Sequence, residues 1–138
     1  MKILVPTDGS EHAMKAVRRA LEFAEKGGVE VILMAIAYNV SPDMVEFPGD
    51  ILEKLDAEAQ EALNKAKKIF DEKGIPVKTV LERGVMPANN IIKRAEEDKV
   101  DLIIMGHRGK GEFPGGGVGS TAAKVVLYAP CNVLIVRK

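Results

Sequence analysis

The sequence predicts an α/β fold in which five parallel strands form one sheet with helices on both faces. Short apolar runs alternate with longer segments in which apolar residues recur every three or four positions, so strands and helices follow one another in strict alternation. The runs are almost continuously apolar, which is typical of parallel strands buried on both faces. At 138 residues the chain has the length of one domain, and we expect residues 1–138 to form it.

The first third of the chain predicts a strand, a helix and a second strand. Residues 2–7 hold the first apolar run, and residues 29–37 hold the second. Between them, residues 13–24 place small and apolar side chains along one helical face. Either Asp8 or Ser10 can cap this helix, because both side chains accept hydrogen bonds from free backbone N–H groups.

The middle of the chain predicts a loop, a long helix and a third strand. Residues 38–49 contain two prolines and no clear periodicity, so we expect a loop there, either a lid or contact surface or a plain surface connection. Residues 51–73 carry a helical stripe of apolar side chains. Residues 77–81 alternate apolar with polar side chains and end at Glu82, Arg83 and Gly84, which favours a less buried strand at the edge of the sheet.

The last third predicts two further helices and two further strands. A helix begins near Pro87, which suits a first helical turn, and a buried strand follows at residues 102–105. Residues 120–128 form the last predicted helix, and Val133–Val136 form the last strand. We expect Val133–Val136 at an edge of the sheet, where an apolar strand can pair with a second chain.

The composition narrows the class of protein. Lysine plus arginine and aspartate plus glutamate number 20 each, so the net charge is zero and the usual electrostatic argument for a nucleic-acid or anionic-membrane partner is absent. No run approaches the roughly 18 apolar residues of a membrane-spanning helix, and the apolar part of the first residues is too short for a signal peptide. We therefore expect a cytoplasmic protein that binds neither nucleic acid nor a membrane.

The segment Gly106–Thr121 is the strongest candidate for a binding site. It holds seven glycines and lies between a buried strand and a helix. Glycines at such a junction let backbone N–H groups approach a ligand, and the N-terminus of the following helix adds its own N–H groups and dipole. This combination is typical of a phosphate site. If the first and fourth strands are neighbours, Thr7 and Asp8 lie at the same crevice as Gly106.

Several catalytic motifs are absent. Gly119 is followed by Ser120 and Thr121 with no lysine, so the segment is not a Walker A loop. The chain has no dinucleotide glycine fingerprint after its first strand, no nucleophile elbow, and no cysteine or histidine spacing typical of a metal site. Phosphoryl transfer usually needs charge clamps and a positioned nucleophile, so we rank catalysis below binding.

The spacing within the loop resembles a known family. Gly106, two residues, Gly109, nine residues, Gly119 and Ser120 follow the pattern of the universal stress protein A family, specifically its ATP-binding branch. Residues 3–10, 101–106 and 129–136 are similar to the family's first, fourth and last strands, so the resemblance covers essentially the whole chain. It implies a Rossmann-like, adenine nucleotide alpha hydrolase-like sheet with strand order 3-2-1-4-5.

The resemblance also implies a site for ATP with Mg²⁺ or Mn²⁺ and a homodimer built through Val133–Val136. The residues whose backbone N–H groups would hold the phosphates are Gly109, Gly119, Ser120 and Thr121. The residues that would line the ribose and the phosphate entrance are Met105, Gly106, His107 and Arg108. The residues that would meet the nucleoside end are Pro6, Thr7 and Asp8, of which Asp8 could help to hold the metal. Ile36 matches the position where backbone groups read adenine.

Some of these residues have simpler roles open to them. Asp8 could serve only as a helix cap, and Arg108 could be a solvated surface charge rather than a phosphate contact. For His107 we expect a solvent-facing loop position rather than a catalytic role, and for His12 a structural role in the first turn of a helix. The glycines could serve flexibility alone. Residues 110–118 are less basic than the corresponding part of the family, so we expect backbone groups to hold the nucleotide.

Three functions are consistent with the sequence. The leading one is a nucleotide-sensing regulatory protein that binds ATP, hydrolyses it slowly or not at all, and presents an altered surface to an unidentified protein partner. The second is a slow ATPase or phosphotransfer enzyme. The third is an interaction module that uses the same fold without a nucleotide, and the intact glycine spacing argues against it.

Overall fold

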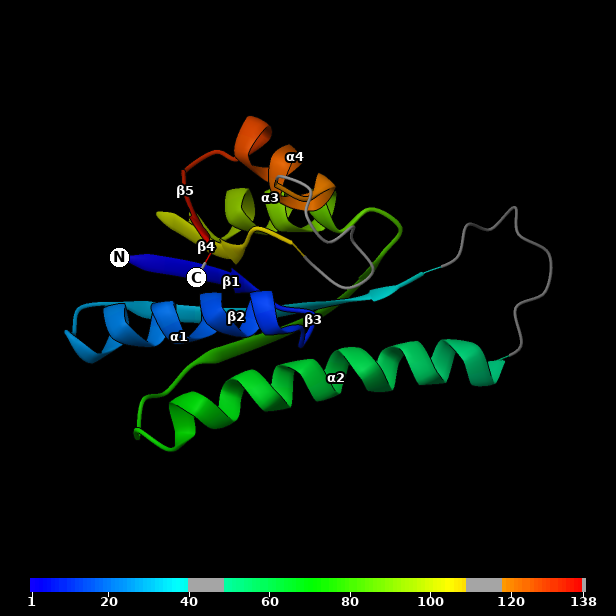
Figure 1. Cartoon of the computed structure of the whole chain (residues 1–138), viewed down its shortest axis with the longest axis horizontal. Helices are drawn as coiled ribbons and strands as arrows, with labels where there is room; N and C mark the ends of the chain where they lie inside the picture. Colours follow the sequence, from blue (N-terminus) through cyan, green and yellow to red (C-terminus); the bar gives the residue numbers. More distant parts are fainter. Residues whose placement is uncertain (40–48, 109–117, 138) are drawn as a thin grey trace.

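The computed structural model describes residues 1–39, 49–108 and 118–137, and these form a five-stranded parallel sheet with the order β3-β2-β1-β4-β5 (Figure 1). The fold class and the strand order are thereby confirmed. The elements in chain order are β1 (Lys2–Pro6), α1 (Glu11–Glu25), β2 (Glu30–Tyr38), α2 (Gly49–Asp71), β3 (Lys78–Gly84), α3 (Pro87–Glu97), β4 (Leu102–Gly106), α4 (Ser120–Tyr128) and β5 (Asn132–Val136). No helix in these stretches is long and apolar enough to cross a membrane.

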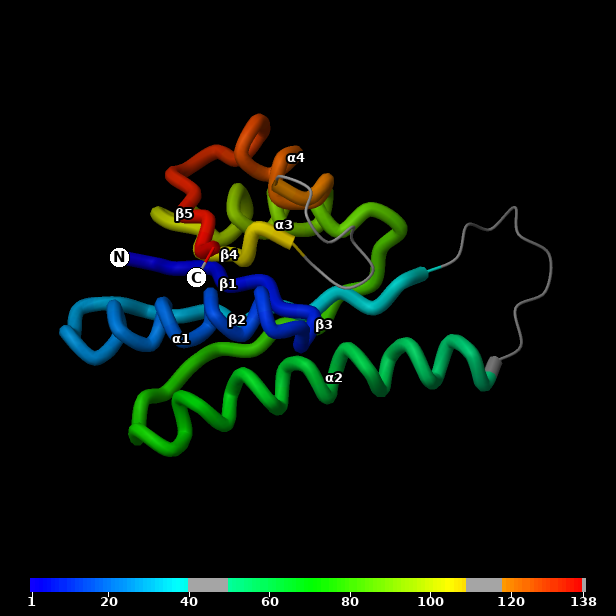
Figure 2. Tube along the Cα trace, in the orientation of Figure 1, coloured from blue at the N-terminus to red at the C-terminus, as the bar shows by residue number. Residues whose placement is uncertain are grey.

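Two helical layers cover the sheet, as the trace in Figure 2 shows, with α1 and α2 on one face and α3 and α4 on the other. Alternate residues of each central strand point to opposite faces because the side-chain period of a strand is two. In β1, Ile3 and Val5 pack with α1 and α2, whereas Leu4 packs with α3 and α4. Both faces of the central strands are therefore buried, which explains why their sequences are apolar runs.

The edge strands are the less buried ones, as their sequences predict. β3 alternates exposed and half-buried residues, and in β5 only Val136 is fully buried. β3 ends at Gly84, as expected, because its polar end continues to pair with β2 up to the register match of Gly84 with Tyr38. Backbone pairing thus extends β3 beyond the part that its apolar side chains indicate.

The order of the strands places the carboxyl ends of β1 and β4 side by side. Ile3 pairs with Leu102 in the parallel register of these two strands. The chain runs from β1 outward to β3 in one direction and from β4 to β5 in the other, so the sheet reverses its order between β1 and β4. Ligand sites in open parallel sheets form at this kind of switch point.

Candidate functional site

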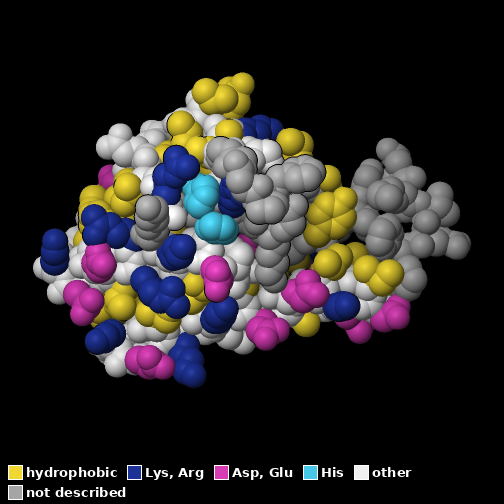
Figure 3. Space-filling view, viewed as in Figure 1, with side chains coloured by type: hydrophobic (Ala, Val, Ile, Leu, Met, Phe, Trp, Pro, Cys, Tyr) yellow, Lys and Arg dark blue, Asp and Glu magenta, His cyan; other side chains and the backbone are white. Residues whose placement is uncertain are grey.

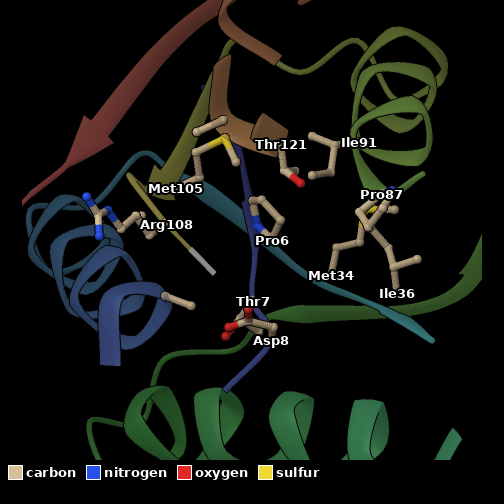
Figure 4. A pocket seen from close by; sticks show the side chains of 13 residues that line it. Pro6, Thr7, Asp8, Met34, Ile36, Pro87, Ile91, Met105, Arg108 and Thr121 are labelled. Carbon is tan, nitrogen blue, oxygen red and sulfur yellow. The ribbon is translucent and has the colours of Figure 1, made fainter. Parts of the chain in front are cut away.

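A cavity of about 210 Å³ opens at the carboxyl ends of β1, β2 and β4, beside the first turns of α3 and α4 (Figure 4). Its lining residues are Pro6, Thr7, Asp8, Ala13, Met34, Ile36, Pro87, Ile91, Met105, Gly106, Arg108, Thr121 and Ala122. Figure 4 shows Arg108 on the opposite side of the cavity from Pro87 and Ile36. The cavity therefore has an apolar side and a side that carries a cation.

Most of the residues expected from the sequence meet at this cavity. The expected residues that line it are Pro6, Thr7, Asp8, Ile36, Met105, Gly106, Arg108 and Thr121. His107, Gly119 and Ser120 lie within two residues of lining residues in the chain but do not line the cavity themselves. Gly109 lies outside the described residues. Segments far apart in the sequence thus converge on one place.

Five lining residues were not expected from the sequence: Ala13, Met34, Pro87, Ile91 and Ala122. Met34 could have been found, because it precedes Ile36 by two positions in a strand and so faces the same side of the sheet. Pro87 and Ile91 are one helical turn apart and share a face of α3. Nothing local in the sequence places that face over the carboxyl end of β2, so only the tertiary structure brings it to the cavity.

The start of α3 is held in place by a half-buried polar cluster around Glu82 of β3. Arg94 donates from Nε to Glu82 Oε2 over 2.8 Å, and Asn90 donates from Nδ2 to Glu82 Oε1 over 3.0 Å. A Cβ on Gly84 would collide with the Asn90 side chain, so β3 and α3 approach closely there. This cluster fixes the wall that Pro87 and Ile91 present to the cavity.

The turn after β1 carries Thr7 and Asp8 into the cavity. Ser10 is the cap of α1, because its Oγ accepts from the Ala13 N–H over 3.2 Å. Asp8 Oδ1 accepts from the Ser10 N–H over 2.9 Å, and Lys65 Nζ of α2 donates to the Gly9 carbonyl over 3.1 Å. Asp8 therefore shapes the turn without capping the helix, and it still borders the cavity.

The N-terminus of α4 lies on the cavity's other side. Gly119 is its N-cap residue and makes no side-chain cap bond. The Gly119 N–H donates to the His107 carbonyl over 2.6 Å, so a phosphate would have to displace this bond to use that donor. The N–H groups of Ser120 and Thr121 occupy the first turn, where helical N–H groups have no intrahelical acceptor. They are the donors that the helix offers to an anion.

His107 is partly exposed, and its ring also packs against another side chain. Its ring is half-buried and lies edge-on against His12 of α1, with ring centroids 4.5 Å apart and planes at 83°. The two histidine side chains form one cyan patch in Figure 3. Burial lowers the pKa of His107, and the charges of His12, Arg137 and Arg108 lower it further. Its carbonyl accepts from the Gly119 N–H and its N–H donates to the Val136 carbonyl, so the backbone of His107 is held by both α4 and β5.

The donor set suits a metal that arrives with its ligand. Within residues 1–39, 49–108 and 118–137, no group of three or more histidine, cysteine or acidic side chains could hold a metal ion. Asp8 is the only carboxylate among the lining residues that the structure describes. Mg²⁺ commonly uses one or two carboxylates together with substrate phosphates, so a single aspartate fits a metal carried by a nucleotide.

Comparison with known proteins identifies the family. A model of the universal stress protein family matches residues 1–137. Universal stress protein MJ0531 of Methanocaldococcus jannaschii is 40% identical over 142 residues, which cover 99% of this chain and 82% of that protein. The chain belongs to the universal stress protein family.

Solved structures of universal stress proteins share the fold and show what some members bind. The structure of MJ0577 from M. jannaschii covers 99% of this chain and 95% of that chain, with a TM-score of 0.87 and 34% identity. The Archaeoglobus fulgidus protein, solved in complex with dAMP, covers 99% and 98%, with a TM-score of 0.75 and 27% identity. A universal stress protein solved in complex with cAMP covers 99% and 97%, with a TM-score of 0.75 and 26% identity.

Proposed function

We propose that this universal stress protein binds ATP in the cavity between β1 and β4 and acts as a nucleotide-dependent regulatory switch with little or slow hydrolysis. The observation that carries the proposal is the convergence of the β1 turn, the end of β4 and the first turn of α4 on one cavity. The solved relatives that hold dAMP and cAMP support an adenine nucleotide as the ligand.

The two sides of the cavity suit the two ends of a nucleotide. Met34, Ile36 and Pro87 offer apolar surface to a base, whereas Arg108 and the first turn of α4 offer positive charge and N–H donors to phosphates. The cavity of about 210 Å³ is smaller than the roughly 300–1,000 Å³ usual for complete ligand sites. It would enclose the base and part of the sugar, and the phosphates would extend along the α4 side.

The cavity is poorly equipped for phosphoryl transfer. Asp8 and Arg108 are the charged residues among the described ones that line it. Within the described part of the chain, the lining residues include no lysine to reach a terminal phosphate and no histidine to serve as a base. Asp8 would help to hold a Mg²⁺ or Mn²⁺ ion that the nucleotide brings, and that ion would neutralise phosphate charge. These features favour a sensor over the second candidate, a slow ATPase.

The test begins with the nucleotide content of the purified protein. The protein is denatured, the released small molecules are identified, and fresh protein is incubated with ATP with and without Mg²⁺. We expect bound ATP that survives incubation largely intact, because the cavity holds phosphates without activating a nucleophile. Steady turnover would favour the enzyme instead. No binding at millimolar ATP would overturn both and leave the interaction module.

We also propose a homodimer that pairs through β5, with the switch then read by an unidentified protein partner in the cytoplasm. Among the described strands β5 has a neighbour only on the β4 side, and three of its apolar residues, Val133, Leu134 and Ile135, are half-buried. On the adjacent α4, Leu127 is 74% exposed. An exposed apolar edge of this kind pairs readily with a second strand.

Light scattering at micromolar concentration is expected to give the mass of a dimer. Val133→Lys should shift the protein to a monomer, because it places a charge on the paired edge. Thr79→Lys adds the same charge to the opposite edge strand, β3, and should leave the dimer intact. Circular dichroism checks that both variants fold. A monomeric wild type, or equal masses for the two variants, would contradict pairing through β5.

A further inference from the structure

The chain has two histidines, and they contact each other beside the cavity although neither lines it. His12 lies in the first turn of α1, and His107 follows β4 directly. The Nδ1 atom of each ring is buried, and neither has a hydrogen-bond partner in the described chain. A buried polar atom without a partner usually marks strain or a function. The binding site proposed above uses neither ring, so the pair calls for a separate explanation.

The pair lies where three elements meet. A Cβ on Gly106 would come within 2.6 Å of the His12 carbonyl oxygen, so the end of β4 is pressed against α1. The His107 N–H donates to the Val136 carbonyl over 3.3 Å, and the His107 carbonyl accepts from the Gly119 N–H over 2.6 Å. His107 therefore joins β5 and the N-cap of α4 to β4. A change at its ring acts directly beside the lining residues Gly106 and Arg108.

Among the described residues, the charges that shift the pKa of His107 are cationic. Arg108 and Arg137 come from the ends of β4 and β5, and His12 faces it from α1. The first turn of α4 brings only the uncharged Ser120 and Thr121. Elsewhere in the first turns of α1 the charged residues are Glu11, which is exposed, and Lys15, which is half-buried. Neither is among the groups that shift His107. Among the residues that the structure describes, no anion is among the groups that shift His107, so a phosphate would be the compensating charge for a proton on this pair.

We propose that the His12–His107 pair is a proton-binding switch of the nucleotide site, so that a proton and an anionic nucleotide bind cooperatively. The phosphates would lie near the first turn of α4, within reach of the field of a protonated pair. Binding of an anion favours the proton, and by reciprocity the proton favours the anion. This inference rests on the proposed function, because it requires a phosphate-bearing ligand at that turn.

The folding stability of the free protein and its affinity for the nucleotide are expected to respond to pH in opposite directions. In the free protein the pKa of His107 is lowered by burial and by neighbouring cations. The unfolded chain therefore takes up the proton first, and the free protein loses stability as the pH falls below the ordinary histidine pKa of about 6.5. A bound phosphate is an anion, so it offsets the effect of the neighbouring cations and raises the pKa of His107. Nucleotide affinity consequently increases as the pH falls through the same range, while the folding stability of the free protein decreases.

The test measures the dissociation constant of ATP by calorimetry between pH 8 and pH 5.5, for the wild type and for His12→Gln. Lowering the pH should strengthen ATP binding by the wild type about three- to tenfold more than it strengthens binding by His12→Gln. A tenfold difference corresponds to a rise of about one unit in the pKa of the histidine pair when the nucleotide binds. The nucleotide's own titration contributes equally to both proteins and cancels in the comparison. Wild-type binding at acidic pH should also take up more protons than binding by the variant, in buffers of different ionisation enthalpy.

Nuclear magnetic resonance supplies an independent measurement. With two histidines in the chain, each imidazole signal can be assigned by substitution. His12→Gln should raise the pKa of His107 in the free protein, because it removes a neighbouring cation. ATP should raise it in the wild type. Equal pH dependence of binding in wild type and variant, or a His107 pKa unmoved by ATP, would overturn the switch alone. Absence of ATP binding at every pH would overturn the proposed function together with it.

Discussion

Gly106→Ala is expected to lower the free energy of unfolding by about 3 kcal/mol, a large part of the stability of a small domain. The added Cβ would meet the His12 carbonyl oxygen at 2.6 Å and the Ala13 nitrogen at 3.2 Å. Both are backbone atoms of α1, which is packed against the sheet through buried residues on one face. Relief therefore requires that α1 or the end of β4 move. Urea unfolding followed by circular dichroism measures the change.

Gly27→Ala is the matched control for this prediction. Gly27 follows α1 with φ at +82°, and a Cβ there meets nothing within 4 Å. Alanine at Gly27 suffers only the backbone strain of the left-handed region, about 1 kcal/mol. The difference between the two variants isolates the close approach of β4 to α1. If Gly106→Ala were no more destabilising than Gly27→Ala, the close packing of these two elements would be refuted.

Gly119→Val is expected to weaken ATP binding at least about 100-fold, or roughly 2.7 kcal/mol, on the basis of the proposed function. Gly119 is the N-cap of α4 with φ at −66° and ψ at 162°, a conformation that valine adopts without strain. The fold should therefore survive the substitution. The branched side chain would instead occupy space at the helix N-terminus, where the phosphates are expected to approach the Ser120 and Thr121 N–H groups. Calorimetric titration with ATP measures the loss.

Ala123→Val provides the matched control on the same helix. Ala123 is exposed and lies one turn beyond Gly119, so valine adds the same kind of bulk without blocking the N-terminus. Its affinity for ATP should remain within about twofold of the wild type. Wild-type affinity in a folded Gly119→Val would place the phosphates elsewhere. If the wild type itself does not bind ATP, the proposed function is rejected, and Gly119→Val then tests nothing further.

The sequence predicted most of the helices and strands of the fold. The apolar runs around Ile3 and Ile103 predict buried strands, and α4 begins and ends where its sequence indicates. β3 ends at Gly84, as expected, although Glu82 and Arg83 are polar, because the strand continues there through backbone pairing with β2. The periodicity of apolar side chains indicates which residues of a strand are buried. It does not indicate residues that belong to the strand through backbone pairing alone.

The candidate site was predictable in part. The glycine spacing and the strand ends indicated Asp8, Gly106 and Thr121, and these line the cavity. The wall made by Pro87 and Ile91 was missed, because its position depends on the contacts of Glu82 with Arg94 and Asn90 across two elements. Contacts between residues distant in the chain leave no periodic trace in the sequence.

Local patterns of apolar residues and glycines are enough to predict the alternation of strands and helices, the burial of the central strands and the family. The tertiary structure alone decided that His12 contacts His107 and that the Gly119 N–H is engaged by the His107 carbonyl. Taken separately, the two histidines read as a structural helix residue and a loop residue. Their contact arises because β4 ends against the first turn of α1, and that packing is set by the whole sheet.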